Sequence, residues 1–321
     1  MPRRRPGAGG ILPRSKLLYY KPLTQLLMED KYHQAISESK VTTNDEEVKA
    51  AVEKIIADNL EANMKPEVYK FLFNCIDLTT LRSIDSPSSV AAFVERVNDF
   101  DNEHPEMPNV AAVCVYPNFA QIARTVLEVS DVDIACVAGC FPSSQSFIEV
   151  KVAEVALAVE GGADEIDIVL NLGNFLDGDY EEVCDEISEL KHSCRDARLK
   201  VILEAGALKT AENIRNASIL SMYSGADFIK TSTGKEYPGA DLQATYVMCQ
   251  CIKEYFEKTG RMVGFKPAGG VRSAKDAVSY FCIVKEVLGE QWLTNEYFRI
   301  GASGLANNLL TEIWGTETKY F

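Results

Sequence analysis

The chain has 321 residues, of which 46% are hydrophobic and 25% are charged, the balance of a globular protein rather than a disordered or fibrous one. Its 47 acidic and 33 basic side chains give a net charge of −14, which argues against a nucleic-acid partner or an anionic membrane surface. No apolar run approaches the ~18 residues that a membrane span needs. We therefore expect a globular protein with neither nucleic acid nor membrane as a partner.

The cysteines and the first residues of the chain indicate in which cellular compartment the protein works. Nine cysteines are present, and the close pairs Cys136/Cys140 and Cys249/Cys251 lack the second pair that a zinc site requires. We expect reduced thiols, a cytoplasmic location and no metal. Residues 1–23 are basic and contain prolines but have no apolar core, so we expect a disordered tail there, with a transit peptide as the alternative.

Residues 24–70 come next and read as a helical extension. The clearest part is DEEVKAAVEKIIADNL, residues 45–60. We expect this extension to be structural and to cover the N-terminal face or the edge of the following domain.

From residue 71 onward, short apolar runs alternate with longer segments of helical period, which is typical of repeated βα units. The predicted strands are 71–79, 109–117, 133–140, 164–170, 199–206, 227–233, 262–269 and 297–303. No G-x-G-x-x-G follows any of them, which argues against an open doubly wound sheet. The pattern predicts the α/β class, with a (β/α)8 TIM barrel over residues 71–314 and a flexible tail over 315–321.

Four of the predicted strands carry a charge where an apolar residue is expected: Asp77, Asp167, Lys230 and Lys266. A single buried lysine is more often part of a structural salt bridge than of an active site. Two lysines and two aspartates on four strands of one barrel instead favour an active site, because the carboxyl ends of barrel strands carry the chemistry.

The two lysines suggest the kind of chemistry. Lys266 follows Lys230 by one βα unit, so the two should occupy adjacent strands. Burial and a neighbouring positive charge both lower the pKa of a lysine and leave a neutral, nucleophilic amine, as a Schiff base requires. Asp167 lies about two units earlier, across the barrel mouth, where it could shuttle protons.

Three glycine-rich loops follow the last three predicted strands: TSTGK (231–235), PAGGVR (267–272) and GASGL (301–305). One such loop alone is more often a simple turn. Three in consecutive units, with the cations Lys235 and Arg272, predict a phosphate site built from backbone N–H groups and basic side chains.

These residues resemble the deoxyribose-phosphate aldolase family, a class I aldolase family of barrel fold, and in particular its eukaryotic type with an N-terminal extension. The resemblance runs in order over about residues 71–314, through DLTTL, AVCVYP, GADEIDIV, ILEAGALK, ADFIKTSTGK, VGFKPAGGVR and RIGASGL. It implies a sugar phosphate as substrate, no cofactor and no metal. It also implies that Lys230 forms the Schiff base and that Asp167 and Lys266 form a proton relay.

The resemblance assigns further residues to the pocket. Asp77 and Cys114 are implied to line it without forming the covalent bond. The residues implied to surround the phosphate are Gly234, Lys235, Gly269, Gly270, Arg272, Gly301 and Ser303. A nucleophilic role for Cys114 is the weaker alternative, because no histidine partner is evident in the sequence.

Two positions depart from the family pattern. Gly304 stands where bacterial relatives have a second serine, which removes one hydroxyl from the phosphate site. The family often ends in a tyrosine that reaches the active site, whereas Tyr320 here is followed by Phe321; Tyr320 is the candidate for that role. A transaldolase-like Schiff-base enzyme and a non-catalytic phosphate-binding barrel are the rival functions. The sequence does not determine whether the protein is a monomer or a homo-oligomer.

Overall fold

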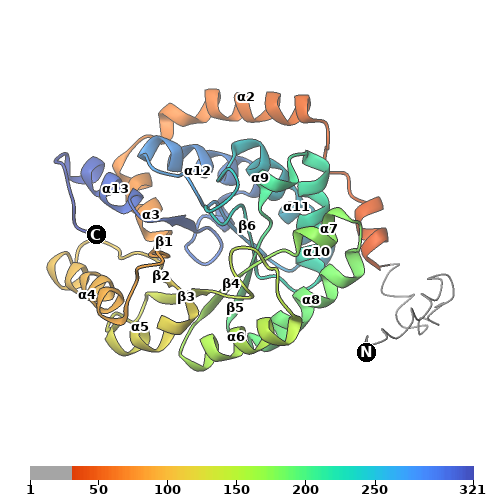
Figure 1. The fold of residues 1–321 in the computed structure, drawn as a ribbon. Coiled ribbons are helices and arrows are strands. Elements are labelled where there is room, and N and C mark those ends of the chain that lie inside the picture. Colours follow the sequence, from red (N-terminus) through yellow and green to blue (C-terminus); the bar gives the residue numbers. More distant parts are fainter. Residues whose placement is uncertain (1–30) are drawn as a thin grey trace, which may run out of the picture.

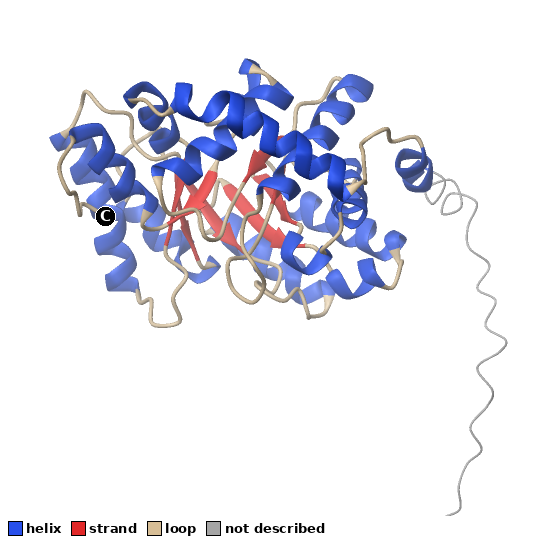
Figure 2. Cartoon of the chain, turned by 90° about the horizontal axis from the view of Figure 1, so that it is seen from above, coloured by secondary structure: helices blue, strands red, loops and turns tan. Residues whose placement is uncertain are grey.

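Eight parallel strands form the centre of the computed structural model, which describes residues 31–321 (Figures 1 and 2). They are β1 (Ile76–Thr79), β2 (Ala112–Val115), β3 (Asp133–Val137), β4 (Glu165–Val169), β5 (Arg198–Ile202), β6 (Phe228–Lys230), β7 (Gly264–Lys266) and β8 (Ile300–Ala302). They pair in the order β7-β6-β5-β4-β3-β2-β1-β8, and parallel bridges Phe265–Phe298 and Ala268–Gly301 join β7 to the β8 segment. The predicted (β/α)8 barrel is therefore confirmed.

Helices surround the barrel (Figure 1). The larger ones, one after each strand, are α4 (Pro87–Glu103), α5 (Ala120–Val126), α6 (Ile148–Glu160), α8 (Tyr180–Ser193), α10 (Ala211–Tyr223), α11 (Leu242–Thr259), α12 (Ala274–Leu288) and α13 (Leu305–Trp314). Shorter pieces are α7 (Leu172–Leu176), α9 (Ala205–Leu208) and the 3-10 turns Pro117–Phe119 and Glu290–Trp292. Within residues 31–321, no helix combines the length and apolar character of a membrane span.

The start of α12 is fixed by its own sequence. The Ser273 hydroxyl accepts a hydrogen bond from the backbone N–H of Asp276, whose carboxylate accepts one from the N–H of Ser273. This reciprocal capping satisfies two backbone donors that the first turn would otherwise leave open. Because the cap follows Arg272 directly, it fixes where the loop after β7 ends at the barrel mouth.

A helical segment at residues 31–37 and the helices α2 (Asp45–Asn63) and α3 (Pro66–Asn74) precede the barrel. Val48, Val52 and Ile55 share one face of α2 and are buried, as a helical period of 3.6 requires. We expected this extension to cover the N-terminal face or the edge of the barrel. In the structure, α2 packs on α11 and α12, outside the ring of helices (Figure 1). Residues 1–23, predicted to form a tail, lie outside the described residues.

The predicted strand 71–79 is wrong in its first half, because residues 71–74 form the last turn of α3. Pro66 occupies the first turn of this helix, where proline is favoured, and Leu72 and Phe73 are fully buried. A short, fully buried apolar run has no period that separates helix from strand. The predicted strand 199–206 likewise ends early, at Ile202, and the helix α9 follows two residues later.

Strand alternation turns charged side chains into the barrel interior. Ile166 and Ile168 of β4 belong to the apolar core, whereas Glu165 and Asp167 point to the opposite face and pair with buried cations. Both carboxylates are fully buried. The centre of the barrel is thus an ionic cluster enclosed by an apolar shell, and buried charges in such a place must be paired.

Candidate active site

A cavity of about 780 Å³ opens where β1, β6, β7 and β8 end. Its walls come from the loops after these strands and from α4, α13 and the chain terminus. The lining residues are 78–82, Phe93, Arg96, Lys230, 233–235, 268–272, 301–304, Asn308 and Phe321. Lys230 lies at the floor of this cavity, and only 4% of its surface is exposed, so its side chain is almost entirely shielded from bulk water.

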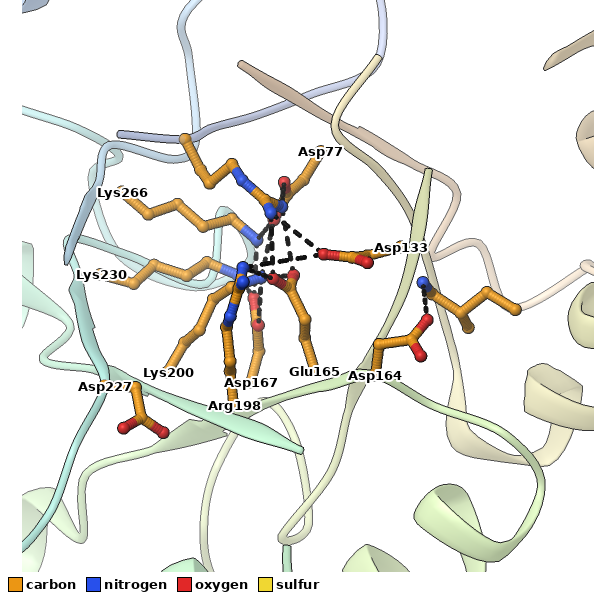
Figure 3. A network of polar contacts seen from close by, with 12 residues as sticks. Asp77, Asp133, Asp164, Glu165, Asp167, Arg198, Lys200, Asp227, Lys230 and Lys266 are labelled. Atoms are coloured by element: carbon orange, nitrogen blue, oxygen red, sulfur yellow. Dashed lines mark hydrogen bonds and ion pairs between the residues drawn. The ribbon is translucent and has the colours of Figure 1, made fainter. Parts of the chain in front are cut away.

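The three predicted catalytic residues meet below this floor (Figure 3). Lys230 and Lys266 are register partners on β6 and β7, as the sequence predicts. Both amines donate to Asp167 Oδ2, at 2.7 Å from Lys230 Nζ and 2.8 Å from Lys266 Nζ. The other oxygen, Asp167 Oδ1, accepts no hydrogen bond within the described part of the chain and lies 3.4 Å from Lys200 Nζ.

The electrostatics separate the two lysines. Burial lowers the pKa of Lys230 below the usual lysine value; Asp167 opposes this shift and Lys266 adds to it. Burial alone would also lower the pKa of Lys266, but contacts with Asp167 and Asp77 outweigh it and raise that pKa. Lys230 is therefore the better nucleophile of the pair, and Lys266 stays an ammonium.

Asp167 is held ionised by its neighbours. Burial would raise its pKa, but Lys200, Lys230 and Lys266 together hold that pKa well below the usual range. A carboxylate beside Lys230 and an open cavity has the geometry of a proton acceptor.

Asp77 and Cys114 lie in the same interior, but neither lines the cavity. The Asp77 carboxylate contacts Lys266 and accepts a hydrogen bond from Lys200 Nζ at 3.0 Å. The Cys114 thiol is fully buried, and burial raises its pKa, which disfavours the thiolate that nucleophilic catalysis needs.

The glycine-rich loops form the opposite side of the cavity, and all seven residues expected around the phosphate line it. The backbones of Gly234 and Gly269 adopt φ angles of +72° and +81°, which residues with side chains rarely adopt. A Cβ on Gly269 would lie 3.1 Å from Gly234 Cα, so both loops depend on glycine to approach. The side chains of Lys235 and Arg272 supply positive charge to this wall.

The model of the DeoC/LacD family of aldolases matches residues 74–283. This chain belongs to that family. The deoxyribose-phosphate aldolase of Homo sapiens is 42% identical over 249 residues, which cover 74% of this chain and 78% of that protein. The Bos taurus deoxyribose-phosphate aldolase is 41% identical over 250 residues, covering 75% and 79%.

The fold agrees with solved structures of the family. The tetrameric deoxyribose phosphate aldolase from Aeropyrum pernix superimposes with a TM-score of 0.61 at 26% identity, over 80% of this chain and 96% of that one. The chain is therefore an aldolase, an enzyme of the lyase class.

Several charged residues of this aldolase interior were not predicted from the sequence. Lys200, Glu165 and Arg299 are buried among the catalytic candidates and bridge them. Each carries the signal that identified the other four, a charge inside an apolar strand segment, in LKVIL, DEIDIV and YFRIGA. Glu204, also missed, accepts hydrogen bonds from the hydroxyl and N–H of Thr233 in the first glycine-rich loop.

The aldolase's C-terminus packs against α4 and α13. The Tyr320 hydroxyl donates to Glu103 at 3.0 Å, and the Asn307 side chain accepts hydrogen bonds from the backbone N–H groups of Tyr320 and Phe321. Phe321, rather than Tyr320, lines the cavity. A tyrosine hydroxyl at the reacting carbon would require the tail to leave this position.

Within residues 31–321, no group of three or more histidine, cysteine, aspartate or glutamate side chains is arranged to hold a metal.

Proposed function

We propose that this aldolase cleaves 2-deoxy-D-ribose 5-phosphate to D-glyceraldehyde 3-phosphate and acetaldehyde through a Schiff base on Lys230. The observation that carries the proposal is the position of Lys230: a buried lysine of lowered pKa at the floor of the cavity, 2.7 Å from a carboxylate. The names of the human and bovine relatives supply the substrate.

The reaction would begin with attack of the neutral Lys230 amine on the C1 aldehyde of the open-chain sugar phosphate. Loss of water then gives an iminium that can accept an electron pair. Asp167 Oδ1, which accepts no hydrogen bond in the described chain, takes the proton of the C3 hydroxyl directly or through water.

Removal of that proton breaks the C2–C3 bond. The C3 fragment leaves as the aldehyde of glyceraldehyde 3-phosphate, and the bonding electrons pass to the iminium, giving an enamine of acetaldehyde. Protonation of the enamine and hydrolysis of the imine release acetaldehyde and restore Lys230. Lys266, held as an ammonium by Asp77 and Asp167, supplies the positive charge of the relay.

The phosphate would sit against the three glycine-rich loops, where backbone N–H groups, Lys235 and Arg272 gather positive character in a protein of net charge −14. The reaction would serve deoxyribonucleotide catabolism in the cytoplasm. A homo-oligomer is proposed by analogy with the tetrameric Aeropyrum pernix enzyme.

Borohydride reduction in the presence of acetaldehyde tests the proposal, because only an imine is trapped in this way. We expect a mass increase on the peptide that contains Lys230. An adduct on Lys266 with Lys230 unmodified would contradict the assignment. The rival transaldolase-like activity predicts trapping with dihydroxyacetone and no cleavage of 2-deoxyribose 5-phosphate.

A further inference from the structure

A second layer of charge lies one step back along the strands from Asp167, at Glu165 of β4, which lies beside Asp167 in Figure 3. Glu165 is fully buried and contacts Lys200, and its two oxygens lie 3.1 and 3.2 Å from the guanidinium of Arg299. Arg299 Nη1 also donates to Asp77 Oδ1 at 2.9 Å. None of Glu165, Arg299 and Lys200 lines the cavity, so this layer acts on a substrate only through other residues.

The buried charges of this layer and of the catalytic residues next to it nearly cancel. Three carboxylates are fully buried there, Asp77, Glu165 and Asp167. Four bases are buried with them: Lys200, Lys230, Lys266 and Arg299. If every group is ionised the cluster carries one excess positive charge, whereas a neutral Lys230 leaves three charges of each sign. At the edge, Asp133 and Arg198 are both part-exposed and add one charge of each sign.

We propose that Glu165 and Arg299 are positioning residues whose opposite charges set the charge balance around Lys230, with Arg299 favouring the neutral amine and Glu165 favouring the ammonium. This proposal rests on the proposed Schiff-base function of Lys230 and extends it to residues outside the cavity.

The contacts form a continuous path from this layer to the amine. Glu165 contacts Lys200, whose Nζ lies 3.4 Å from Asp167 Oδ1, and Asp167 Oδ2 accepts the hydrogen bond from Lys230. Strand register fixes the second of these relations, because Asp167 and Lys200 are partners on β4 and β5. In a water-free interior such charges interact over several ångströms with little screening.

Among the four buried bases, Lys230 is the one that can take up or give up a proton. The pKa values of Lys200, Lys266 and Arg299 are raised: burial lowers each, but the carboxylates outweigh it. Removing one positive charge therefore favours protonation of Lys230, and removing one negative charge disfavours it. The ionisable groups around Lys230 are Asp77, Cys114, Glu165, Asp167, Lys200, Glu204, Lys266 and Arg299.

The test measures the rate of borohydride trapping with acetaldehyde against pH, in the full-length chain. The acid limb of this pH–rate profile reports the deprotonation of Lys230 within the cluster of interacting charges. It does not depend on phosphate binding, because acetaldehyde carries no phosphate. We expect Arg299→Gln to move this limb to higher pH and Glu165→Gln to move it to lower pH, each by about one unit. The double variant restores the balance, and its limb should return toward that of the wild type.

A matched control is available outside the barrel. Lys151 and Glu186 form another buried ion pair, at 2.7 Å, between α6 and α8. Glu186→Gln should lower the melting temperature without moving the acid limb. Because a buried variant can fail to fold, Arg198→Gln provides a second test: Arg198 is 38% exposed and lies 3.4 Å from Glu165. Its loss should move the limb to higher pH by a smaller amount.

The outcomes separate this inference from the proposed function. Wild-type trapping at a residue other than Lys230 would refute the Schiff-base assignment itself. If trapping occurs at Lys230 but the acid limb stays at the wild-type pH in Arg299→Gln, Glu165→Gln and Arg198→Gln, the inference is overturned and the Schiff-base assignment stands. Limbs that move in the same direction in Arg299→Gln and Glu165→Gln would also overturn it, since charge balance requires opposite signs.

Discussion

Lys230 and Lys266 are register partners on adjacent strands, and the protein shifts their pKa values in opposite directions. The difference comes from their carboxylate contacts. Lys266 contacts both Asp77 and Asp167, whereas Lys230 opens to the cavity and, within residues 31–321, forms an ion pair with Asp167 only. Two residues of the same type, side by side, thus differ in how readily they lose a proton, and Lys230 loses its proton more readily.

Replacing Lys266 by leucine tests this division. The variant loses the neighbouring charge that lowers the pKa of Lys230, and Asp167 loses one of its cations. We expect the cleavage rate to fall by about 100-fold or more and the pKa of Lys230 to rise. The pH profile of cleavage checks both effects, and an unchanged rate with an unchanged profile would rule out this role of Lys266.

The lowered pKa of Lys230 also has a cost in stability. Between the lowered pKa and the usual lysine value, the unfolded chain binds a proton that the folded chain does not. The contribution of Lys230 to the free energy of unfolding is therefore smallest at a pH below its lowered pKa, and it increases as the pH rises toward the usual lysine value. We expect Lys230→Met to raise the melting temperature at neutral pH by a few degrees, as often happens when an active-site group is removed.

Calorimetry of the wild type and Lys230→Met from pH 6 to pH 10 provides the measurement. The gap between the two melting temperatures should narrow as the pH rises, because the wild type gains stability and the variant has no such group. A Lys230→Met variant that is less stable than the wild type at every pH would show that the ion pair with Asp167 outweighs the cost of burial.

The sequence predicts the barrel and the residues at its mouth for a physical reason. A charge inside an apolar strand is conspicuous, and the spacing of one βα unit places Lys230 beside Lys266. Lys200 and Arg299 carry the same signal, but which buried charges contact each other depends on strand register, which spacing alone does not give. The start of β1 was misplaced because the buried apolar run before Ile76 suits a helix equally well.

The glycine-rich wall predicts selective recognition of phosphate. Arg272 lines the cavity, and no carboxylate within residues 31–321 forms an ion pair with its side chain. We expect Arg272→Ala to lower kcat/KM for 2-deoxyribose 5-phosphate by about 10- to 100-fold and to leave cleavage of unphosphorylated 2-deoxyribose nearly unchanged. Equal losses on the two substrates would indicate that Arg272 supports the loop rather than the phosphate.

The C-terminus gives the last prediction. The Tyr320 hydroxyl donates a hydrogen bond to Glu103, and this exposed contact contributes little to stability. Phe321 lines the cavity and packs against Phe73 and Phe100. We expect deletion of Phe321 to raise KM for the sugar phosphate several-fold, because the cavity loses part of its apolar wall. Tyr320→Phe should leave KM within a factor of about two.

Proton exchange at the acetaldehyde methyl group separates this docked arrangement from the role that the family resemblance suggests for a terminal tyrosine. If the Tyr320 hydroxyl protonates the enamine, the tail must undock, and Tyr320→Phe would slow the exchange while borohydride trapping at Lys230 stays intact. From the docked geometry we expect exchange at the wild-type rate in Tyr320→Phe. Slower exchange in that variant, followed by NMR in deuterated buffer, would show that the hydroxyl leaves Glu103 and reaches the reacting carbon during turnover.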